Sequence, residues 1–329
     1  MTPRCRWNEL SVAVDQTAIA APLLEPAAAH ATLTPKQRLA IVERPERRFA
    51  LALAAPAVAL LAITTTLPLF YLLWQSLQSI NLAMPGMEQF IGLENYTRMW
   101  NDARFWAALQ FSVTYTVATV SMQVVIGLGL ALLVLQIPRA QWAFRMAAIL
   151  PIVLAPVVAG LFWRTLMLTQ DFGVVDFATR WLGLGSFNWL GDPTLARVSV
   201  IAIHTWQWTP FVFLYLLAAI ATVPPDLYEA AKIDRANAWR RFMHITLPLI
   251  RPAIVIVVIL RMTTALSAFA AIYAATGGGP GTATEILNLY AYRVSFAEMS
   301  LGYGAASAVV LLALTMAIAG VLFHVRRAR

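Results

Sequence analysis

The chain has 329 residues, of which 60% are hydrophobic and 12% are charged, and its formal net charge is +8. Soluble domains carry about 25% charged residues, so this composition excludes an ordinary soluble domain and favours a polytopic α-helical membrane protein. Basic residues are expected beside membrane spans, so we interpret the positive charge as a sign of membrane lipid around the chain and expect no nucleic-acid partner.

Residues 1–49 are expected to form a mobile cytoplasmic tail that ends in a basic juxtamembrane segment. The first part is rich in Ala, Pro and Thr, and its short apolar run is broken by Pro22 and Pro26. A signal peptide would begin closer to the N-terminus, so we expect an uncleaved first span. The basic residues that precede this span are Lys36, Arg38, Arg44, Arg47 and Arg48.

Several apolar runs are long enough to cross a bilayer core about 30 Å thick, which requires roughly 20 residues per helix. We predict six spans, at residues 50–77, 106–135, 144–168, 197–221, 250–275 and 302–324. The connections on one side are rich in arginine and those on the other in carboxylates, which places both termini in the cytoplasm. The sequence therefore predicts an all-α integral membrane protein with a six-span domain over residues 50–325.

A charged amphipathic segment, residues 224–247, lies between the fourth and fifth predicted spans. Pro224 and Pro225 suit the first turn of a helix, and Asp226 complements the helix dipole. Asn237 is a suitable N-cap for a second short helix. Such a pair of helices can dock into a groove of a partner protein or lie on the bilayer surface, and physical arguments alone leave both open.

The predicted spans contain neither Asp nor Glu. Proton- and cation-coupled carriers usually bury carboxylates, and an intramembrane hydrolase needs an acid and a base, so both classes are disfavoured and we expect no catalytic residues. The single cysteine, Cys5, cannot form an internal disulfide, and no His, Cys or carboxylate cluster has metal-ligand spacing. We therefore expect no metal site.

One face of the fourth predicted span carries His204, Trp208, Phe211 and Tyr215, at i, i+4, i+7 and i+11. An aromatic face with polar edges suits a sugar ring, which has apolar patches ringed by hydroxyls. The same spacing also marks ordinary packing between helices, so a binding face and a packing stripe both remain open.

Arg261 lies near the middle of the fifth predicted span, where a charge costs at least about 2.5–3.5 kcal/mol. A residue kept at that cost needs a polar cavity, a partner or a ligand. Thr264 lies one turn further along the same face. Arg261 either lines a solute pathway or serves only as a hydrogen-bond donor between helices.

The segment after Pro225 carries a recognisable motif. The order Glu229-Ala230-Ala231, Asp234, Ala236, Phe242, Ile245, Leu247-Pro248 and Pro252 resembles the "EAA" loop of binding-protein-dependent ABC importer permeases. The segments FIGLENYTRMW, ILPIVLAPVVAGLFW and TGGGPGTATEILNLYAYRVSF are similar to the carbohydrate branch of that family, which includes maltose and glycerol-phosphate permeases. The resemblance covers the chain from about residue 50.

This resemblance implies a function, partners and site residues. It implies a multi-pass permease subunit in the inner membrane of a bacterium, which imports a carbohydrate or polyol with a second, non-identical permease subunit, a cytoplasmic ABC ATPase dimer and an extracytoplasmic solute-binding protein. The coupling helix pair would contact the ATPase through Glu229, Ala230, Ala231, Asp234, Arg235 and Phe242. The pathway would include His204, Trp208, Phe211, Arg261 and Thr264, because related permeases that bind sugar use the same two helices.

Two features bear on the motor and on the coupling turn. The only lysines are Lys36 and Lys232, neither in a Gly-rich turn, so ATP and Mg are expected on partner subunits and no cofactor on this chain. The family pattern places glycine where this chain has Arg235, and arginine tolerates a left-handed backbone less well, by roughly 1 kcal/mol or more.

Two alternatives to a carbohydrate importer stay open. One is the same machinery carrying glycerol phosphate or another solute, and the other is an ATP-independent channel or secondary carrier.

Overall fold

The computed structural model describes residues 35–137 and 141–327, and the chain divides into two units at Leu69 and Phe70. The first unit contributes most of helix α2 (Pro35–Ser76), so the basic residues before the first apolar run belong to the same helix as that run. The predicted tail lies largely in residues 1–34, outside the described residues.

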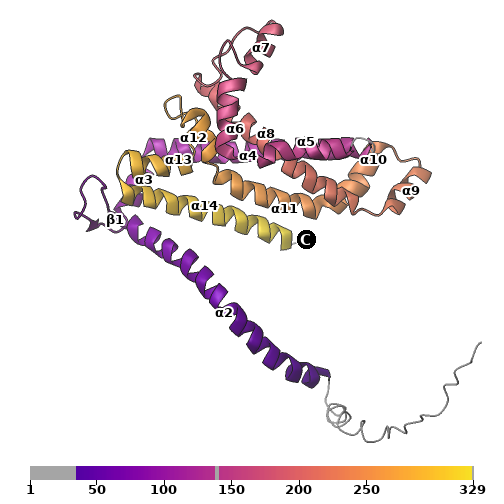
Figure 1. Ribbon diagram of the computed structural model, residues 1–329, viewed down its shortest axis with the longest axis horizontal. Helices are drawn as coiled ribbons and strands as arrows, with labels where there is room; N and C mark the ends of the chain where they lie inside the picture. The colour runs from indigo at the N-terminus through magenta and orange to yellow at the C-terminus, as the bar shows by residue number, and fades with distance from the viewer. Residues whose placement is uncertain (1–34, 138–140, 328–329) are drawn as a thin grey trace, which may run out of the picture. The chain divides into compact units, whose positions relative to one another are not determined.

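The second unit contains all the other described elements (Figure 1). Its strands form one small antiparallel pair, β1 (Gln78–Ser79) and β2 (Gln89–Phe90). The α-helices are α3 (Glu94–Trp100), α4 (Ala103–Leu135), α5 (Gln141–Val153), α6 (Pro156–Phe162), α7 (Val174–Trp181), α8 (Pro193–Ala221), α9 (Pro225–Ile233), α10 (Ala238–Arg241), α11 (Leu247–Leu266), α12 (Ala270–Thr276), α13 (Leu287–Tyr292) and α14 (Leu301–Arg327). Three π-helical turns, η2 (Trp163–Met167), η3 (Phe242–Thr246) and η4 (Arg293–Ala297), follow α6, α10 and α13.

Among the described residues, five helices are long and apolar enough to span a membrane. The number of spans is six if the bent pair α5–α6 forms one more. They are Ala52–Ser76, Ala103–Leu135, Pro193–Ala221, Ala238–Leu266 and Leu301–Gly320. The prediction of a mostly helical membrane protein is confirmed, and four of the predicted spans match a long helix within a few residues. The third and fifth predicted spans differ.

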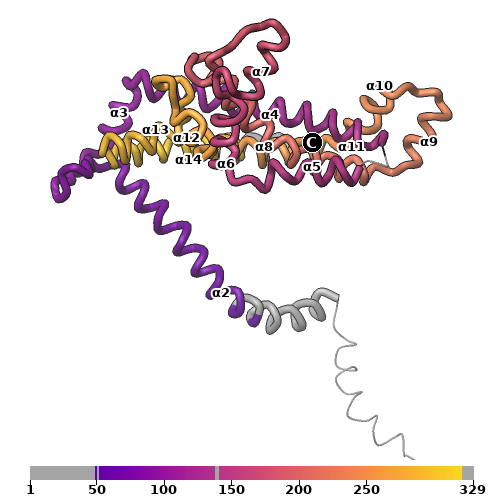
Figure 2. The backbone as a smooth tube through the Cα atoms, turned by 45° about the horizontal axis from the view of Figure 1, so that its top comes forward, coloured from indigo at the N-terminus to yellow at the C-terminus, as the bar shows by residue number. Residues whose placement is uncertain are grey.

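The core of the second unit is the packing of α4 against α8. These helices run alongside each other and alongside α5 and α11 (Figures 1 and 2). Each of α4 and α8 begins at an aspartate N-cap, Asp102 or Asp192, whose side chain accepts two backbone N–H bonds. A Cβ added to Gly127 would lie 3.0 Å from the backbone N of Phe213, so this glycine permits the close approach of the two helices.

The third predicted span, 144–168, corresponds to two helices, α5 and α6, and not to one straight helix. The run bends by 97° between α5 and α6. Pro156 lacks an N–H and pushes the preceding Ala155 into an extended conformation, with φ of −57° and ψ of 138°. The amide Nε2 of Gln207 in α8 donates to the Leu154 carbonyl at 3.0 Å, so a carbonyl left free by the break is satisfied.

The fifth predicted span, 250–275, differs in its bounds from the long helix Ala238–Leu266. Helix α11 ends at Leu266, and the chain starts a separate helix, α12, at Ala270. No proline or glycine marks this break, so its cause is tertiary. Helix α12 packs against α6, and a Cβ on Gly160 would lie 2.5 Å from the Ala271 carbonyl oxygen. Asn288 donates to the Ser267 carbonyl at 3.2 Å.

Asp102 joins three helices at the end of α4 that lies furthest from α9. Its carboxylate accepts hydrogen bonds from Tyr290 at 2.5 Å and Tyr303 at 2.9 Å, and from the backbone N–H groups of Arg104 and Phe105. Burial alone would raise the pKa of Asp102, but these hydrogen bonds together lower it. The resulting stabilisation is present at neutral pH and is lost as the pH falls through the lowered pKa.

Asp176 organises the connection between η2 and α8. This buried carboxylate accepts from the backbone N–H groups of Phe187 and Asp171 and from the Ser186 hydroxyl, each at 3.0 Å, and pairs with Arg180 at 3.3 Å. The bond from Phe187 is the largest of several contributions that lower the pKa of Asp176. The connection is therefore held by internal polar contacts although most of its large apolar side chains are exposed.

We predict that Gly160→Ala destabilises the protein, because the new methyl group would meet the backbone of α12. Overpacking of this kind costs about 1–3 kcal/mol. The apparent thermal midpoint of the purified protein should fall. Gly129→Ala is the matched control, since a Cβ there meets nothing within 4 Å and alanine favours a helix over glycine by about 1 kcal/mol. An unchanged midpoint for Gly160→Ala would contradict the close crossing of α6 and α12.

Candidate functional site

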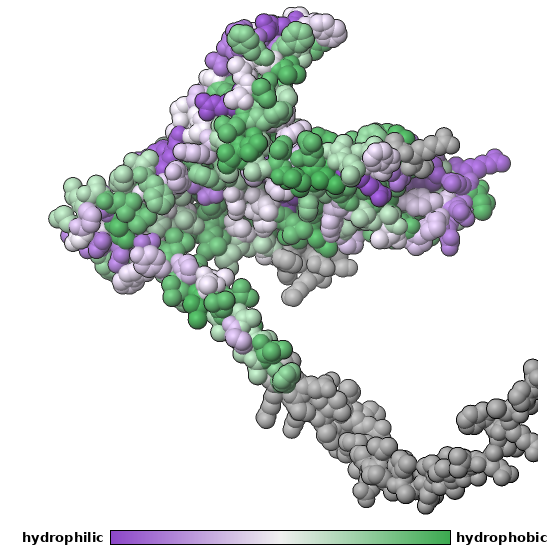
Figure 3. Space-filling view, viewed as in Figure 1, coloured by the Kyte–Doolittle hydropathy of each residue, from purple (hydrophilic) through white to green (hydrophobic). Residues whose placement is uncertain are grey.

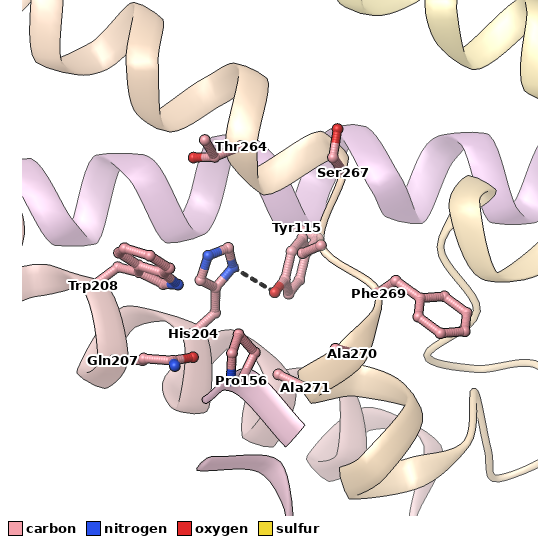
Figure 4. A pocket seen from close by; sticks show the side chains of 11 residues that line it. Tyr115, Pro156, His204, Gln207, Trp208, Thr264, Ser267, Phe269, Ala270 and Ala271 are labelled. Carbon is pink, nitrogen blue, oxygen red and sulfur yellow. Dashed lines mark hydrogen bonds between the residues drawn. The ribbon is translucent and has the colours of Figure 1, made fainter. Parts of the chain in front are cut away.

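A cavity of about 270 Å³ lies between α4, α8 and α11, at the place where both broken runs meet (Figure 4). The start of α6 at Pro156 and the break after α11 at Ser267–Phe269 contribute to its wall. The broken helices therefore position the site, since they open space inside the bundle. The polar and aromatic side chains that line it are Tyr115, His204, Gln207, Thr264, Ser267, Trp208 and Phe269.

Beside the cavity lies a buried polar network centred on Arg261, which is 2% exposed. Its Nε donates to Gln123 Oε1 at 3.0 Å, and its Nη2 lies 3.0 Å from His204 Nε2. The guanidinium carbon lies 4.3 Å from the centre of the Trp208 ring. Hydrogen bonds and a cation–π contact thus offset part of the desolvation cost of this charge, and no carboxylate of residues 35–137 or 141–327 pairs with it.

The network continues from His204 to α4. Its Nδ1 lies 2.5 Å from the hydroxyl oxygen of Tyr115, drawn as the dashed line in Figure 4. Gln123 also contacts α8, because its Nε2 donates to the His204 carbonyl at 3.3 Å. Side chains of α4, α8 and α11 are therefore joined by consecutive hydrogen bonds next to the cavity wall.

Of the residues expected along a solute pathway, some line the cavity and others do not. His204, Trp208 and Thr264 line the cavity, whereas Arg261 lies behind His204 and Trp208 and does not line it. Phe211 packs with Tyr215 against the apolar core between α4 and α8. The aromatic stripe on α8 is thus a cavity wall at one end and a packing surface at the other.

Sequence reasoning missed Tyr115, Gln207, Ser267 and Phe269 on the cavity wall and Gln123 in the network beside it. Gln123 is 0% exposed and Gln207 is 1% exposed. A buried amide within an apolar span is costly, as a buried charge is, and that cost was a usable sign for both glutamines. Tyr115 lacked such a sign, because tyrosine is common in packing interfaces.

The helix pair α9–α10 forms one end of the second unit, where hydrophilic residues gather in Figure 3. Asn237 caps α10 as predicted, since its side chain accepts from the Arg240 N–H at 2.8 Å. Arg235 has a φ of +52°, so the chain keeps a left-handed turn here with arginine in place of glycine.

The surface of this pair offers both charged and apolar groups. Glu229, Ala230, Asp234 and Arg235 are exposed, Phe242 is half-buried and Ala231 is buried. Ile233 is 82% exposed and Trp239 is 64% exposed. A hollow of about 310 Å³ is lined by Ala231, Asp234, Ala236, Arg240, Arg241, His244 and Ile245. Exposed apolar groups around such a hollow are typical of a surface that contacts another macromolecule.

Comparisons with known proteins identify the family to which this chain belongs. Residues 124–328 match the family model described as "Binding-protein-dependent transport system inner membrane component". The chain is 37% identical over 284 residues to the sulfoquinovosyl glycerol transport system permease protein of Agrobacterium fabrum, covering 86% of this chain and 92% of that protein. It is 36% identical to the trehalose transport system permease protein of Mycobacterium tuberculosis, covering 83% and 87%.

A solved structure confirms the fold. A chain of the bacterial ABC transporter for the import of alginate superposes with a TM-score of 0.72 at 22% identity, covering 88% of this chain and 99% of that chain.

We predict that Arg261→Met destabilises the assembled protein. The change keeps an apolar stem but leaves the buried acceptors Gln123 Oε1 and His204 Nε2 without their donor, at about 1–3 kcal/mol for each. Adding Gln123→Leu removes one of these acceptors, so the double variant should be less destabilised than the sum of the two single changes. The apparent thermal midpoints of the variants measure this coupling.

Arg145→Met is the matched control, because Arg145 is exposed on α5 and makes only a peripheral contact with Gln141. Its effect should stay within about 0.5 kcal/mol. Equal midpoints for Arg145→Met and Arg261→Met would show that the network contributes no stability.

Proposed function

Because the chain belongs to the family of binding-protein-dependent transport system inner membrane components, we propose that it is the transmembrane permease subunit of an ATP-driven ABC importer for a carbohydrate or polyol. The observation that carries the proposal is the cavity within the helical bundle, where the Trp208 ring lies beside neutral polar groups. The names of relatives such as the sulfoquinovosyl glycerol and trehalose permeases support this class of solute.

The proposed arrangement has six spans, with α5 and α6 together forming the third. In this proposal α9–α10 and both termini lie on the cytoplasmic side of a bacterial inner membrane, which the arginine-rich connections support. Residues 50–325 form the permease domain, and residues 224–247 form the coupling segment within it. Its exposed Glu229, Ile233 and Trp239 support docking into a partner rather than a purely structural role.

The partners in this proposal are a second permease subunit, a cytoplasmic ATPase dimer that binds ATP and Mg, and an extracytoplasmic solute-binding protein. The coupling segment would contact the ATPase through the exposed Glu229, Ala230, Asp234 and Arg235. Ala231 and Phe242, which are less exposed, would support that surface from within. Closure of the ATPases would then move α9–α10 and change which side of the membrane the cavity faces.

A second candidate solute is an anion such as glycerol phosphate. The observation that favours it is the positive charge of Arg261 near the cavity. The absence of a charged side chain among the residues that line the cavity favours the neutral solute.

We expect deletion of the gene in its native cells to abolish ATP-dependent uptake of at least one of three labelled neutral sugars, trehalose, maltose and lactose. Re-expression of a tagged chain should restore uptake and co-purify an ATPase. Undiminished uptake of all three, together with loss of glycerol 3-phosphate uptake, would instead establish the second candidate.

We predict that Glu229→Lys uncouples uptake from ATP hydrolysis, because Glu229 is exposed on α9, the first helix of the proposed docking surface. Uptake per assembled complex should fall at least tenfold while insertion is unaffected. Arg235→Gly is the matched variant in the same segment, and it should retain coupling because glycine relieves a left-handed conformation that costs arginine roughly 1 kcal/mol. Full uptake and solute-stimulated hydrolysis after Glu229→Lys would refute the docking surface.

A further inference from the structure

The position of Arg261 fixes where the proton of His204 lies. Arginine has hydrogen-bond donors and no acceptor, so its Nη2 can only donate to His204 Nε2, 3.0 Å away. Nε2 therefore carries no proton. A neutral imidazole then has its proton on Nδ1, which donates to the hydroxyl oxygen of Tyr115 at 2.5 Å.

The opposite direction of the hydrogen bond between Tyr115 and His204 is inconsistent with the position of Arg261. If Tyr115 donated to Nδ1, the proton of His204 would lie on Nε2 and would face an arginine N–H across 3.0 Å. An imidazolium has the same conflict. Gln123 is oriented as well, because its Oε1 accepts from Arg261 and its Nε2 donates to the His204 carbonyl. Along the path from Arg261 through His204, each donor thus points towards Tyr115.

The hydroxyl hydrogen of Tyr115 has no acceptor among the described residues in this assignment. Tyr115 lines the cavity and is 1% exposed, and within the described part of the chain its hydroxyl has a hydrogen bond only to His204. Gln207 lines the same cavity, and its buried Oε1 has no hydrogen-bond partner among the described residues, since its Nε2 is used by the Leu154 carbonyl. Tyr115 and Gln207 thus both line the cavity, and each keeps one hydrogen-bonding group, a donor on Tyr115 and a buried acceptor on Gln207, without a partner among the described residues.

We propose that this cavity binds an uncharged, hydroxyl-bearing part of the solute, with Tyr115 as the specificity-determining donor and Gln207 as an acceptor. A hydroxyl group both accepts and donates, so adjacent hydroxyls satisfy both residues, whereas a phosphate or carboxylate leaves Gln207 Oε1 facing another acceptor. Arg261 is a positioning residue, which acts through His204 and does not contact the solute. This inference rests on the proposed carbohydrate import and names the chemistry of its site.

The first test needs no solute. Solid-state ¹⁵N NMR of the complex with labelled histidine, assigned with His204→Gln, should show His204 protonated at Nδ1 and not at Nε2. Arg261→Met should remove this preference. A proton on Nε2, or on both nitrogens, in the unchanged protein would overturn the network.

The second test is Tyr115→Phe, which removes the donor and keeps the ring. We expect the KM for uptake of trehalose, maltose or lactose to rise about tenfold, as the loss of one buried hydrogen bond predicts, while the maximal rate per assembled complex changes less. Tyr215→Phe is the matched control, because Tyr215 packs against the apolar core of α8 outside the cavity and its KM should stay unchanged.

The outcomes separate the two proposals. An unchanged KM for Tyr115→Phe in a complex that transports one of these sugars would overturn the role of Tyr115 and leave carbohydrate import standing. Competition by glycerol 3-phosphate that is stronger than by any of the sugars would overturn the neutral solute. Failure of the unchanged complex to transport any sugar would refute the proposed function, and the NMR measurement would still decide the proton position.

Discussion

The organisation of the site depends on one buried charge, that of Arg261, which has no carboxylate partner within the described part of the chain. Arg261 lies on α11, is 2% exposed, and is surrounded by an amide, an imidazole and an indole face. A guanidinium only donates, so each neighbour must turn an acceptor or an electron-rich face towards it. One residue on α11 thereby sets the orientation of side chains on α4 and α8, which are also the two helices that form the apolar core.

The sequence predicted those elements whose cause is local. Long apolar runs gave α4, α8 and α14 within a few residues, and the buried charge pointed to Arg261 by its cost alone. The bend before α6 also has a local cause in Pro156, although the predicted third span runs through it. The break after Leu266 has no local cause, because it depends on how α12 packs against α6 across Gly160.

The site was predictable only in part for the same reason. His204 and Trp208 share one helix face, so periodicity found them, but it also suggested Phe211, which packs in the core. Tyr115 and Gln123 belong to another helix, and their roles follow from the rotation of α4 against α8. That rotation is set by many small contacts, including the close approach at Gly127, which a single sequence does not reveal.

Two of the three helices that hold the network, α8 and α11, flank the proposed coupling segment. Helix α8 carries His204 and leads into α9, while α10, η3 and α11 form one run from Ala238 to Leu266 that carries Arg261. Ala238 and Arg261 are separated by about 35 Å along this run at 1.5 Å per residue. A rigid helix transmits a displacement along its length, so movement of α10 relative to α9 would shift Arg261 against His204. Arg261 Nη2 and His204 Nε2 are 3.0 Å apart, so a slide of one helical turn would break the hydrogen bond between them. The donor that Tyr115 offers to the cavity would then depend on the position of the coupling segment.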